Sequence, residues 1–324
     1  MKSWDALTER GRLRRLRQVA DDALCRYALR ADRLRLVGGF TNAVFRVDAG
    51  AARFALRVDA MQDHSDAEVD AEVAWLDALA QDGLPTARVV KAASGAPYVF
   101  ASAPGVPGPR RCVLFAWIPG RPLGRGATPA QYRALGKLSA ELHLHARGHP
   151  GVGRPMPWDR VFYYPESVDP VVIHDASMAH HFTGGRRAVL DAALARVTKA
   201  FARRRSQELQ LVHGDLHPWN VHTFRGALTA LDFEDVMWAH PVQDVAITLS
   251  YLRERPDYAA LRDGFEAGYR DVARWPETYP GELDCFIAAR QLMFVNFVAN
   301  VRADPSAFYA TTFPQLERFL EAWG

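Results

Sequence analysis

The chain has few cysteines, and those it has are far apart. Cys25, Cys112 and Cys285 are the three cysteines among its 324 residues. Their spacing matches neither a metal-binding pattern nor the framework of a disulfide-stabilised domain. We therefore expect a protein of a reducing, cytoplasmic compartment.

Segments that would direct the chain to a membrane are also missing. Residues 1–5 are charged and contain no apolar signal core. The most apolar late stretch, residues 285–301, is interrupted by Arg290, Asn296 and Asn300. It therefore predicts a buried helix and not a membrane span, and we expect no membrane partner.

Neither sign of charge is in large excess. The sequence has 40 Lys and Arg against 37 Asp and Glu, a formal net charge of +3. Proteins that bind nucleic acid usually have a basic face, whereas the arginine runs at 12–17 and 203–205 are local and helix-like, which favours solvated faces. We expect no nucleic-acid partner. About half of the residues are apolar (49%), which suits a soluble chain with a sizeable core.

Hydrophobic patterning divides the chain into a β-rich first part and a helical second part. Strands are expected at residues 34–36, 44–48, 53–58, 87–90, 98–101, 112–117, 211–213 and 228–231. Helices are expected at residues 4–30, 66–80, 129–146, 185–205, 241–252, 257–273, 283–302 and 314–322. This order predicts an α+β protein with an N-terminal lobe at 1–117 and a helical C-terminal lobe at 118–324.

The most informative segment is Leu211-Val-His-Gly-Asp-Leu-His-Pro-Trp-Asn220. Its H-x-D-x-x-x-x-N spacing matches the catalytic loop of phosphoryl-transfer enzymes. Asp215 is the candidate catalytic residue that takes the proton of an acceptor hydroxyl. His213, also assigned to the catalytic loop, is expected to brace it by hydrogen bonds, and a structural role is expected for His217.

A metal loop follows at Leu231-Asp-Phe-Glu-Asp235. Asn220 and Asp232 supply the oxygen atoms that Mg²⁺ prefers in proteins, and phosphate oxygens and water would complete its coordination. We predict that they hold magnesium against nucleotide phosphates. Glu234 and Asp235 either support these ligands or face the acceptor.

A glycine-rich turn, Gly38-Gly39-Phe40-Thr41-Asn42, lies between two strand-like runs. Glycine allows the backbone to come close to a triphosphate, so that amide groups can point at its oxygens. The segment is therefore a candidate phosphate-covering loop. An ordinary hairpin turn is the alternative.

A cation on the following strand is a second candidate for nucleotide binding. Arg57 could pair with the donor phosphates, and Ala55 is small enough for the roof of an adenine pocket. Glu72 or Glu68 on the next helix could hold Arg57 by an ion pair, and the position of the apolar residues favours Glu72. The alternatives are a surface arginine and an exposed helical carboxylate.

Three further features allow two interpretations each. Asp244 could accept hydrogen bonds from the backbone of the catalytic loop, or be an acidic residue favoured in the first turn of a helix. The aromatic residues of 158–164 could pack an inserted segment or line an acceptor cleft. His174, His180 and His181 lack carboxylate or cysteine partners at metal spacing, which argues against a zinc site.

Together these motifs resemble the aminoglycoside phosphotransferase-like family, which includes choline and ethanolamine kinases, type II homoserine kinases, methylthioribose kinases and a bacterial stress-response Ser/Thr kinase. The resemblance covers residues 34–252. It implies a protein-kinase-like bilobal fold, ATP (or GTP) as donor and Mg²⁺ as cofactor. Residues 113–120, Val-Leu-Phe-Ala-Trp-Ile-Pro-Gly, resemble the hinge. Backbone groups of Ala116, Trp117 and Ile118 would then bind adenine. Arg57 departs from the lysine that most kinases have there.

The resemblance implies a kinase that transfers the γ-phosphoryl group to a hydroxyl of a small molecule. An aminoglycoside, an amino alcohol and a homoserine-like compound are the candidate acceptors. The C-terminal lobe shows no excess of carboxylates that would indicate a polycationic acceptor, and aromatic rings could enclose a quaternary amine. The residues of 154–159 resemble the homoserine-kinase and stress-kinase branches. A Ser/Thr protein kinase and a non-catalytic nucleotide-binding module are the alternatives.

Overall fold

The fold is described from a computed structural model. It covers residues 2–323 except 40–41, 62–63, 150–152, 154 and 205–208. The chain forms two compact units, one of residues 1–120 with 229–231 and one of residues 121–228 with 232–324. The first is rich in strands and the second is mainly helical, which confirms the predicted α+β class.

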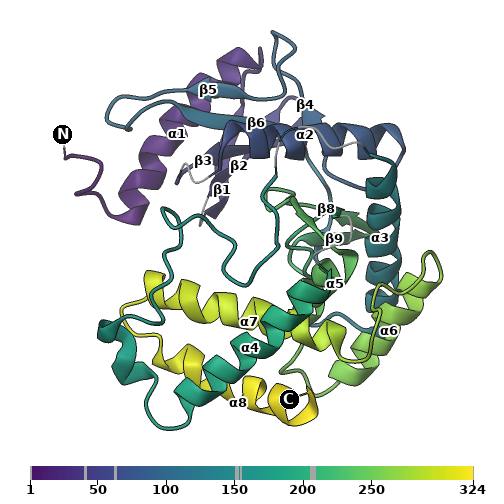
Figure 1. The fold of residues 1–324 in the computed structure, drawn as a ribbon. Coiled ribbons are helices and arrows are strands. Elements are labelled where there is room, and N and C mark those ends of the chain that lie inside the picture. The colour runs from purple at the N-terminus through teal and green to yellow at the C-terminus, as the bar shows by residue number, and fades with distance from the viewer. Residues whose placement is uncertain are drawn as a thin grey trace. The chain divides into compact units, whose positions relative to one another are not determined.

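An antiparallel sheet forms the centre of the N-terminal unit (Figure 1). Its strands are β1 (Arg33–Gly39), β2 (Asn42–Ala49), β3 (Ala52–Asp59), β4 (Val89–Val90), β5 (Val99–Ala101) and β6 (Arg110–Ala116). They follow the order β1-β2-β3-β6-β4, and β5 also pairs with β6. Gly50, with φ of 58°, lies in the turn between β2 and β3, because glycine adopts the left-handed conformation without a steric penalty.

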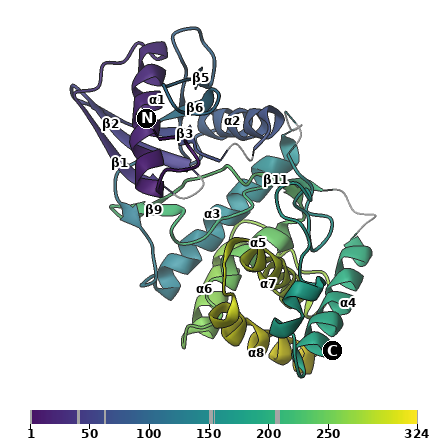
Figure 2. The ribbon, with the colours of Figure 1, turned by 90° about the vertical axis from the view of Figure 1, so that its left-hand side faces the viewer.

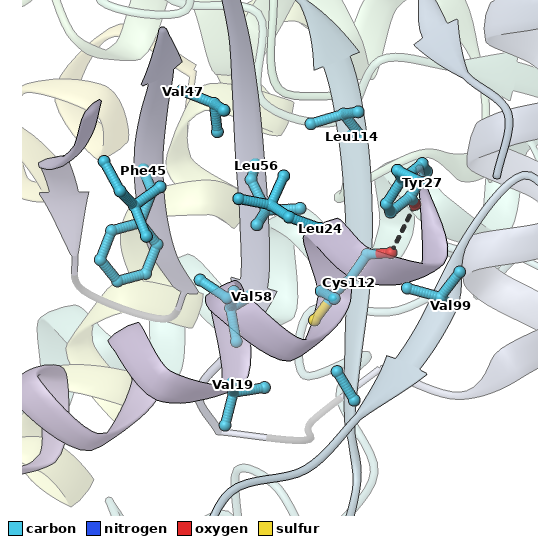
Figure 3. Packing of buried hydrophobic residues seen from close by; sticks show 14 of the residues in the cluster. Val19, Leu24, Tyr27, Phe45, Val47, Leu56, Val58, Val99, Cys112 and Leu114 are labelled. Atoms are coloured by element: carbon cyan, nitrogen blue, oxygen red, sulfur yellow. Dashed lines mark hydrogen bonds between the residues drawn. The ribbon is translucent and has the colours of Figure 1, made fainter. Parts of the chain in front are cut away.

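Helix α1 (Glu9–Arg26) covers one face of this sheet and completes its main core. Figure 3 shows Val19 and Leu24 of the helix among Leu56, Val58 and Leu114 of the strands. The hydroxyl of Tyr27 donates a hydrogen bond of 2.9 Å to the carbonyl oxygen of Cys112, so that its polar end is satisfied in the core.

Helix α2 (Asp66–Gln81) packs on the opposite face, since Val113 of β6 contacts it while its neighbours Cys112 and Leu114 point into the main core. A capping box starts α2. The hydroxyl of Ser65 accepts from the amide of Glu68, and the carboxylate of Glu68 accepts from the amide of Ser65. This start point determines which side of α2 faces the sheet.

The C-terminal unit consists mainly of helices (Figure 2). It also contains strands of a three-stranded sheet, β10-β9-β7, and of a two-stranded sheet, β11-β8. The helices are α3 (Pro129–Gly148), η1 (Ala176–His181), α4 (Arg186–Arg204), α5 (Pro241–Ser250), α6 (Tyr258–Arg270), α7 (Glu282–Val301) and α8 (Ser306–Trp323). The strands are β7 (Arg121–Pro122), β8 (Gln210–Val212), β9 (Val221–Phe224), β10 (Ala227–Ala230) and β11 (Met237–Ala239). Residues 229–231, which are the last two residues of β10 and the residue after it, group with the N-terminal unit.

Helix α7 is the centre of the helical unit and contacts α4, α5 and α8. Most of its residues are buried on all sides, so the predicted buried helix is confirmed. Within the part of the chain that the structure describes, no helix is long and apolar enough to span a membrane.

Two helices differ clearly from their expected bounds. Helix α1 is shorter, at residues 9–26 instead of 4–30, and α8 is longer than expected. The sequence predicts a helix at 314–322, whereas α8 begins at Ser306 and contains Pro314 in its interior. The buried Tyr309 and Phe313 pack against Phe182, and this contact favours the additional turns. Tertiary packing outweighs the lost backbone hydrogen bond here.

Candidate active site

The candidate catalytic loop follows strand β8 and turns sharply at Gly214. This residue has φ of 80°, and a Cβ atom there would overlap the backbone carbonyl of Asp235. Only glycine fits both conditions. The turn places Asp215 at the end of the strand, as the sequence suggested.

Four side chains contact the carboxylate of Asp215, two at each oxygen. Oδ1 accepts from Nη2 of Arg290 and from the hydroxyl of Tyr251, both at 3.2 Å. Oδ2 accepts from Nδ2 of Asn220 at 3.2 Å and lies 3.3 Å from Nε2 of His217. The side chain is 18% exposed. Each oxygen is therefore held by two side chains.

These contacts keep Asp215 ionised. Burial by itself raises the pKa of the carboxyl, but the hydrogen bond from His217, followed by the charge of Arg290, outweighs it. The pKa is lowered to about 2. Asp215 is thus a carboxylate at neutral pH and a hydrogen-bond acceptor only.

Arg290 is a site residue that the sequence reasoning did not identify. It lies on α7 and is only 5% exposed. Its Nη1 donates to the hydroxyl of Tyr163 at 2.9 Å, and its guanidinium lies 4.7 Å from the ring centre of Phe294. The available signal was a single arginine in a helix that is otherwise rich in apolar residues.

A buried chain of hydrogen bonds braces the loop from behind. The amide of Gly214 donates to Oδ1 of Asp244 at 2.9 Å, so the bracing interpretation of Asp244 is confirmed. Its Oδ2 lies 2.9 Å from Nε2 of His143, whose Nδ1 lies 2.8 Å from the hydroxyl of Tyr269. His143 and Tyr269 were not predicted, because they lie on α3 and α6, far from the loop in sequence.

The two histidines of the loop have structural contacts. The ring of His213 is fully buried against Phe233, and its Nδ1 accepts the amide hydrogen of Asp215 at 3.3 Å. Nδ1 of His217 accepts the amide hydrogens of Trp219 and Asn220, both at 3.2 Å. Because Nδ1 of His217 is an acceptor, Nε2 carries the proton and can donate to Asp215.

Asn220 and Asp232 have the donor atoms that a magnesium ion requires. Nδ2 of Asn220 is committed to the backbone carbonyl and Oδ2 of Asp215, at 3.0 and 3.2 Å, so its carbonyl oxygen is the atom left for a metal. Asp232 is exposed and has φ of 60°, an uncommon conformation for a residue other than glycine. Glu234 and Asp235 are half-buried. These residues fit a magnesium site, and their roles stay predictions.

A cavity of about 810 Å³ lies in the helical unit, and two contacts of Asp215 line it: Arg290 and Tyr251. Its wall also contains aromatic rings, two amide side chains and charged groups of both signs. They include Arg125, Tyr132, Trp219, Glu254, Arg255, Asp257, Gln291, Phe294, Phe308, Thr311, Thr312 and Gln315.

The aromatic residues of 158–164 are mainly packing residues. Trp158 is buried among Phe201, Phe286 and Tyr163. Tyr163 is also buried, but its hydroxyl contacts Arg290 and so connects this segment with the candidate site.

Within the described residues, no group of three His, Cys, Asp or Glu could hold a metal ion.

In the N-terminal unit, the predicted ion pair between Arg57 and Glu72 is present. The two guanidinium nitrogens Nη1 and Nη2 donate to the two oxygens of Glu72 at 2.8 and 2.5 Å. Both side chains are buried, and the guanidinium lies 5.4 Å from the ring centre of Phe115. Glu68 belongs to the capping box of α2 instead. Ala55 lies on β3. Phosphate binding by Arg57 and the role of Ala55 in the roof of an adenine pocket stay predictions.

The glycine-rich turn joins β1 to β2. Gly38 pairs with Val44 and Gly39 with Ala43 in the sheet, and the register shifts between Leu36 and Gly38. Asn42 begins β2. Phe40 and Thr41 lie outside the described residues, so both the phosphate-covering and the hairpin interpretation of this turn stay predictions.

Of the three backbone amides at 116–118, two have backbone acceptors in the described part of the chain. The amide of Ala116 donates to the carbonyl of Arg88 at 2.9 Å, and the amide of Trp117 to that of Arg53 at 3.1 Å. Among the described residues, the amide of Ile118 has no such partner. Adenine binding by residues 116–118 stays a prediction, with Ile118 as its amide donor.

Comparison with known proteins places this geometry in a family. A protein of Deinococcus radiodurans, described as uncharacterized, is 27% identical over 286 residues, which cover 86% of this chain and 80% of that protein. A solved structure of a microcompartment-associated aminopropanol kinase has a TM-score of 0.77 at 23% identity, and 95% of this chain and 98% of that chain are covered.

A second solved structure, an amicoumacin kinase in complex with AMP-PNP, Ca²⁺ and amicoumacin, has a TM-score of 0.74 at 18% identity over 93% of each chain. These likenesses show the protein-kinase-like fold. The model of the phosphotransferase enzyme family matches residues 32–280, the strands of the N-terminal unit and both candidate loops included. The chain therefore belongs to the phosphotransferase enzyme family.

Proposed function

We propose that this phosphotransferase is an ATP-dependent kinase that moves the γ-phosphoryl group onto a hydroxyl of a small molecule. The observation that carries the proposal is the carboxylate of Asp215. It is ionised, fixed by four side chains and placed in the H-x-D-x-x-x-x-N spacing of phosphoryl-transfer enzymes.

Asp215 would act mainly by orienting the acceptor. A carboxylate with a pKa of about 2 is a weak base, and it does not remove a proton from a free hydroxyl in advance. It can accept a hydrogen bond from that hydroxyl and align its oxygen for attack. The proton then passes to Asp215 late, when bond formation to phosphorus has made the hydroxyl acidic.

The proposed ligands of the nucleotide are a magnesium ion and a buried arginine. A magnesium ion on the carbonyl oxygen of Asn220 and the carboxylate of Asp232 would neutralise phosphate charge. Arg57, fixed by Glu72, would bind donor phosphates through its permanent charge. The amicoumacin kinase was solved with an ATP analogue and a divalent cation, which supports this choice of donor and metal.

The cavity beside Asp215 is the proposed place of the acceptor. Its wall contains three arginines and two carboxylates, and the carboxylates are already paired, Asp257 with Arg255 and Glu254 with Gln315. Such a wall offers no excess of negative charge to a polycation. We therefore favour an acceptor with at most one ammonium group, such as an amino alcohol or a homoserine-like compound, over an aminoglycoside.

The decisive experiment is the release of ADP from Mg·ATP by the purified protein across an acceptor panel. The panel contains 1-amino-2-propanol, choline, homoserine, threonine, methylthioribose, amicoumacin, an aminoglycoside and a generic protein. We expect one small-molecule class to stimulate release. Replacing Asp215 by Asn should lower turnover about 10²–10⁴-fold.

Two controls decide between the proposal and its alternatives. Omission of Mg²⁺ should abolish the stimulated release, and GTP in place of ATP tests the donor. Stimulation by the generic protein alone would contradict a small-molecule acceptor. Tight ATP binding without turnover, unchanged in the Asp215→Asn variant, would contradict the kinase proposal itself.

A further inference from the structure

We infer that Arg290, anchored by Tyr163, is the positioning residue that orients the carboxylate of Asp215, and this inference rests on the proposed function. Nη2 of Arg290 lies 3.2 Å from Oδ1 of Asp215, although the two residues are 75 positions apart. A distant, central helix thus supplies a charged contact to the one side chain that would orient the acceptor.

The contact restricts the rotation of the Asp215 carboxylate. Asn220 and His217, both in the catalytic loop, hold Oδ2, whereas Arg290 and Tyr251 hold Oδ1. The loop by itself therefore determines the place of one oxygen only. The second oxygen, Oδ1, is held by Tyr251 at the C-terminal end of α5 and by Arg290 of α7. An acceptor hydroxyl would approach this oxygen next to the Arg290 contact.

Contacts with residues other than Asp215 fix the position of Arg290. Its Nη1 donates to Tyr163, whose ring is buried and stacks on Tyr164 at 4.5 Å. The ring of Phe294 lies on the guanidinium at 4.7 Å. A guanidinium held at one nitrogen and on one face has little freedom, so it can position the carboxylate that it contacts.

A second ion pair between an arginine and a carboxylate lies elsewhere in the helical unit and serves as a matched control for the contact between Arg290 and Asp215. Arg204 of α4 donates through Nε and Nη2 to the carboxylate of Glu282 on α7, at 2.5 and 2.8 Å. Arg204 is 8% exposed, close to the 5% of Arg290. This pair does not contact Asp215. Loss of either arginine should lower stability, because each leaves a buried carboxylate uncompensated.

The test compares Arg290→Met, Arg290→Lys, Tyr163→Phe and Arg204→Met with the parent protein. We measure kcat, KM for ATP, the melting temperature and the crystal structure of each. For Arg290→Met we expect kcat to fall about 10²-fold with an unchanged KM for ATP, since misplacement by about 1 Å has that effect. Arg290→Lys should recover part of the loss and Tyr163→Phe should show a smaller one. Arg204→Met should lose thermal stability and keep kcat.

The crystal structures keep the inference testable under every outcome. We expect Asp215 to leave its parent rotamer in Arg290→Met and to keep it in Arg204→Met. The inference would be overturned if Arg290→Met had the same Asp215 rotamer and the same turnover as Arg204→Met. If no acceptor is turned over by the parent, the proposed function fails, and the rotamer of Asp215 alone then decides on Arg290. If Arg290→Met does not fold, Arg290→Lys and Tyr163→Phe take its place in both comparisons.

Discussion

At the scale of a residue, Arg57 shows how a buried, permanently charged side chain is held in one orientation. The carboxylate of Glu72 accepts hydrogen bonds from Nη1 and Nη2 of the Arg57 guanidinium, and the ring of Phe115 lies against the face of that guanidinium. An unpaired charge would be costly here, so Glu72 both stabilises and orients Arg57. Arginine differs from lysine in this respect, because its planar fork matches both carboxylate oxygens at once.

This arrangement gives a prediction for nucleotide binding. Replacement of Glu72 by Gln leaves the charge of Arg57 uncompensated, and we expect a lower melting temperature and a KM for ATP that rises about tenfold. Steady-state ADP release measures the KM. Glu68→Gln is the matched control on the same helix, since glutamine also completes a capping box. Equal KM values in the two variants would contradict a role of Glu72 in holding Arg57.

The residue scale also shows what the sequence could provide and what it could not. Glu72 was preferred to Glu68 because the apolar residues of a single helix define its faces, and the ion pair is present. Asp215 and Asn220 were identified from a short motif, and their contact is local. Arg290 was missed because no spacing rule links a residue on α7 to one that lies 75 positions earlier.

At the scale of elements, α3 and α6 approach each other so closely that glycines are required at their contact. A Cβ atom on Gly136 of α3 would overlap the backbone of Phe265, and one on Gly268 of α6 would overlap that of Arg133. These helices carry His143 and Tyr269, which brace Asp244 behind the catalytic loop. The glycines therefore contribute to the position of the loop.

The close approach predicts the effect of a single methyl group. Gly268→Ala should lower the free energy of unfolding by about 1–3 kcal/mol, because the added Cβ atom forces the helices apart. Gly148→Ala, at the end of α3, is the control, because no atom lies within 4 Å of a Cβ there. Urea unfolding of both variants measures the difference. A Gly268→Ala variant as stable as Gly148→Ala would contradict the proposed tight contact.

Elements followed from the sequence wherever local signals and packing agree. Helix α2 begins at a capping box, and the predicted helix at 66–80 nearly matches its bounds. The helix predicted at 314–322 is too short, because the turns before Pro314 are stabilised by the burial of Tyr309 and Phe313, which is a tertiary effect. The loop after Gly214 needs the backbone of Asp235 beside it, and this long-range contact has no local signature.

At the scale of the whole molecule, the stability of the helical unit depends on a buried histidine. His240 lies next to the Arg204–Glu282 pair. Burial, followed by the charge of Arg204, lowers its pKa from 6.5 to about 4. Unfolding exposes the imidazole and restores its ordinary pKa. The unfolded chain therefore binds more protons than the folded one between these two values, and stability decreases as the pH falls from about 6.5 to about 4.

A variant separates this histidine from the other groups that titrate in the same range. We expect the urea midpoint of the parent protein to fall between pH 6.5 and 4.5, and to fall less in His240→Asn. Asparagine suits this position because His240 is the N-cap of α5, and asparagine is a favoured N-cap residue. Identical pH profiles of parent and variant would show that His240 is not the group responsible.

The fully occupied carboxylate of Asp215 has a consequence for how such an enzyme can change its substrate. An incoming hydroxyl gains a hydrogen bond at Oδ1 only by replacing another, for example that of Tyr251, so this exchange contributes little to affinity. If the neighbouring cavity takes the acceptor, as proposed, recognition depends on its wall, while the proposed chemistry depends on the loop and Arg290. Substitutions in that wall could introduce a new acceptor and leave the reaction intact, so divergence of substrates needs no redesign of the catalytic loop.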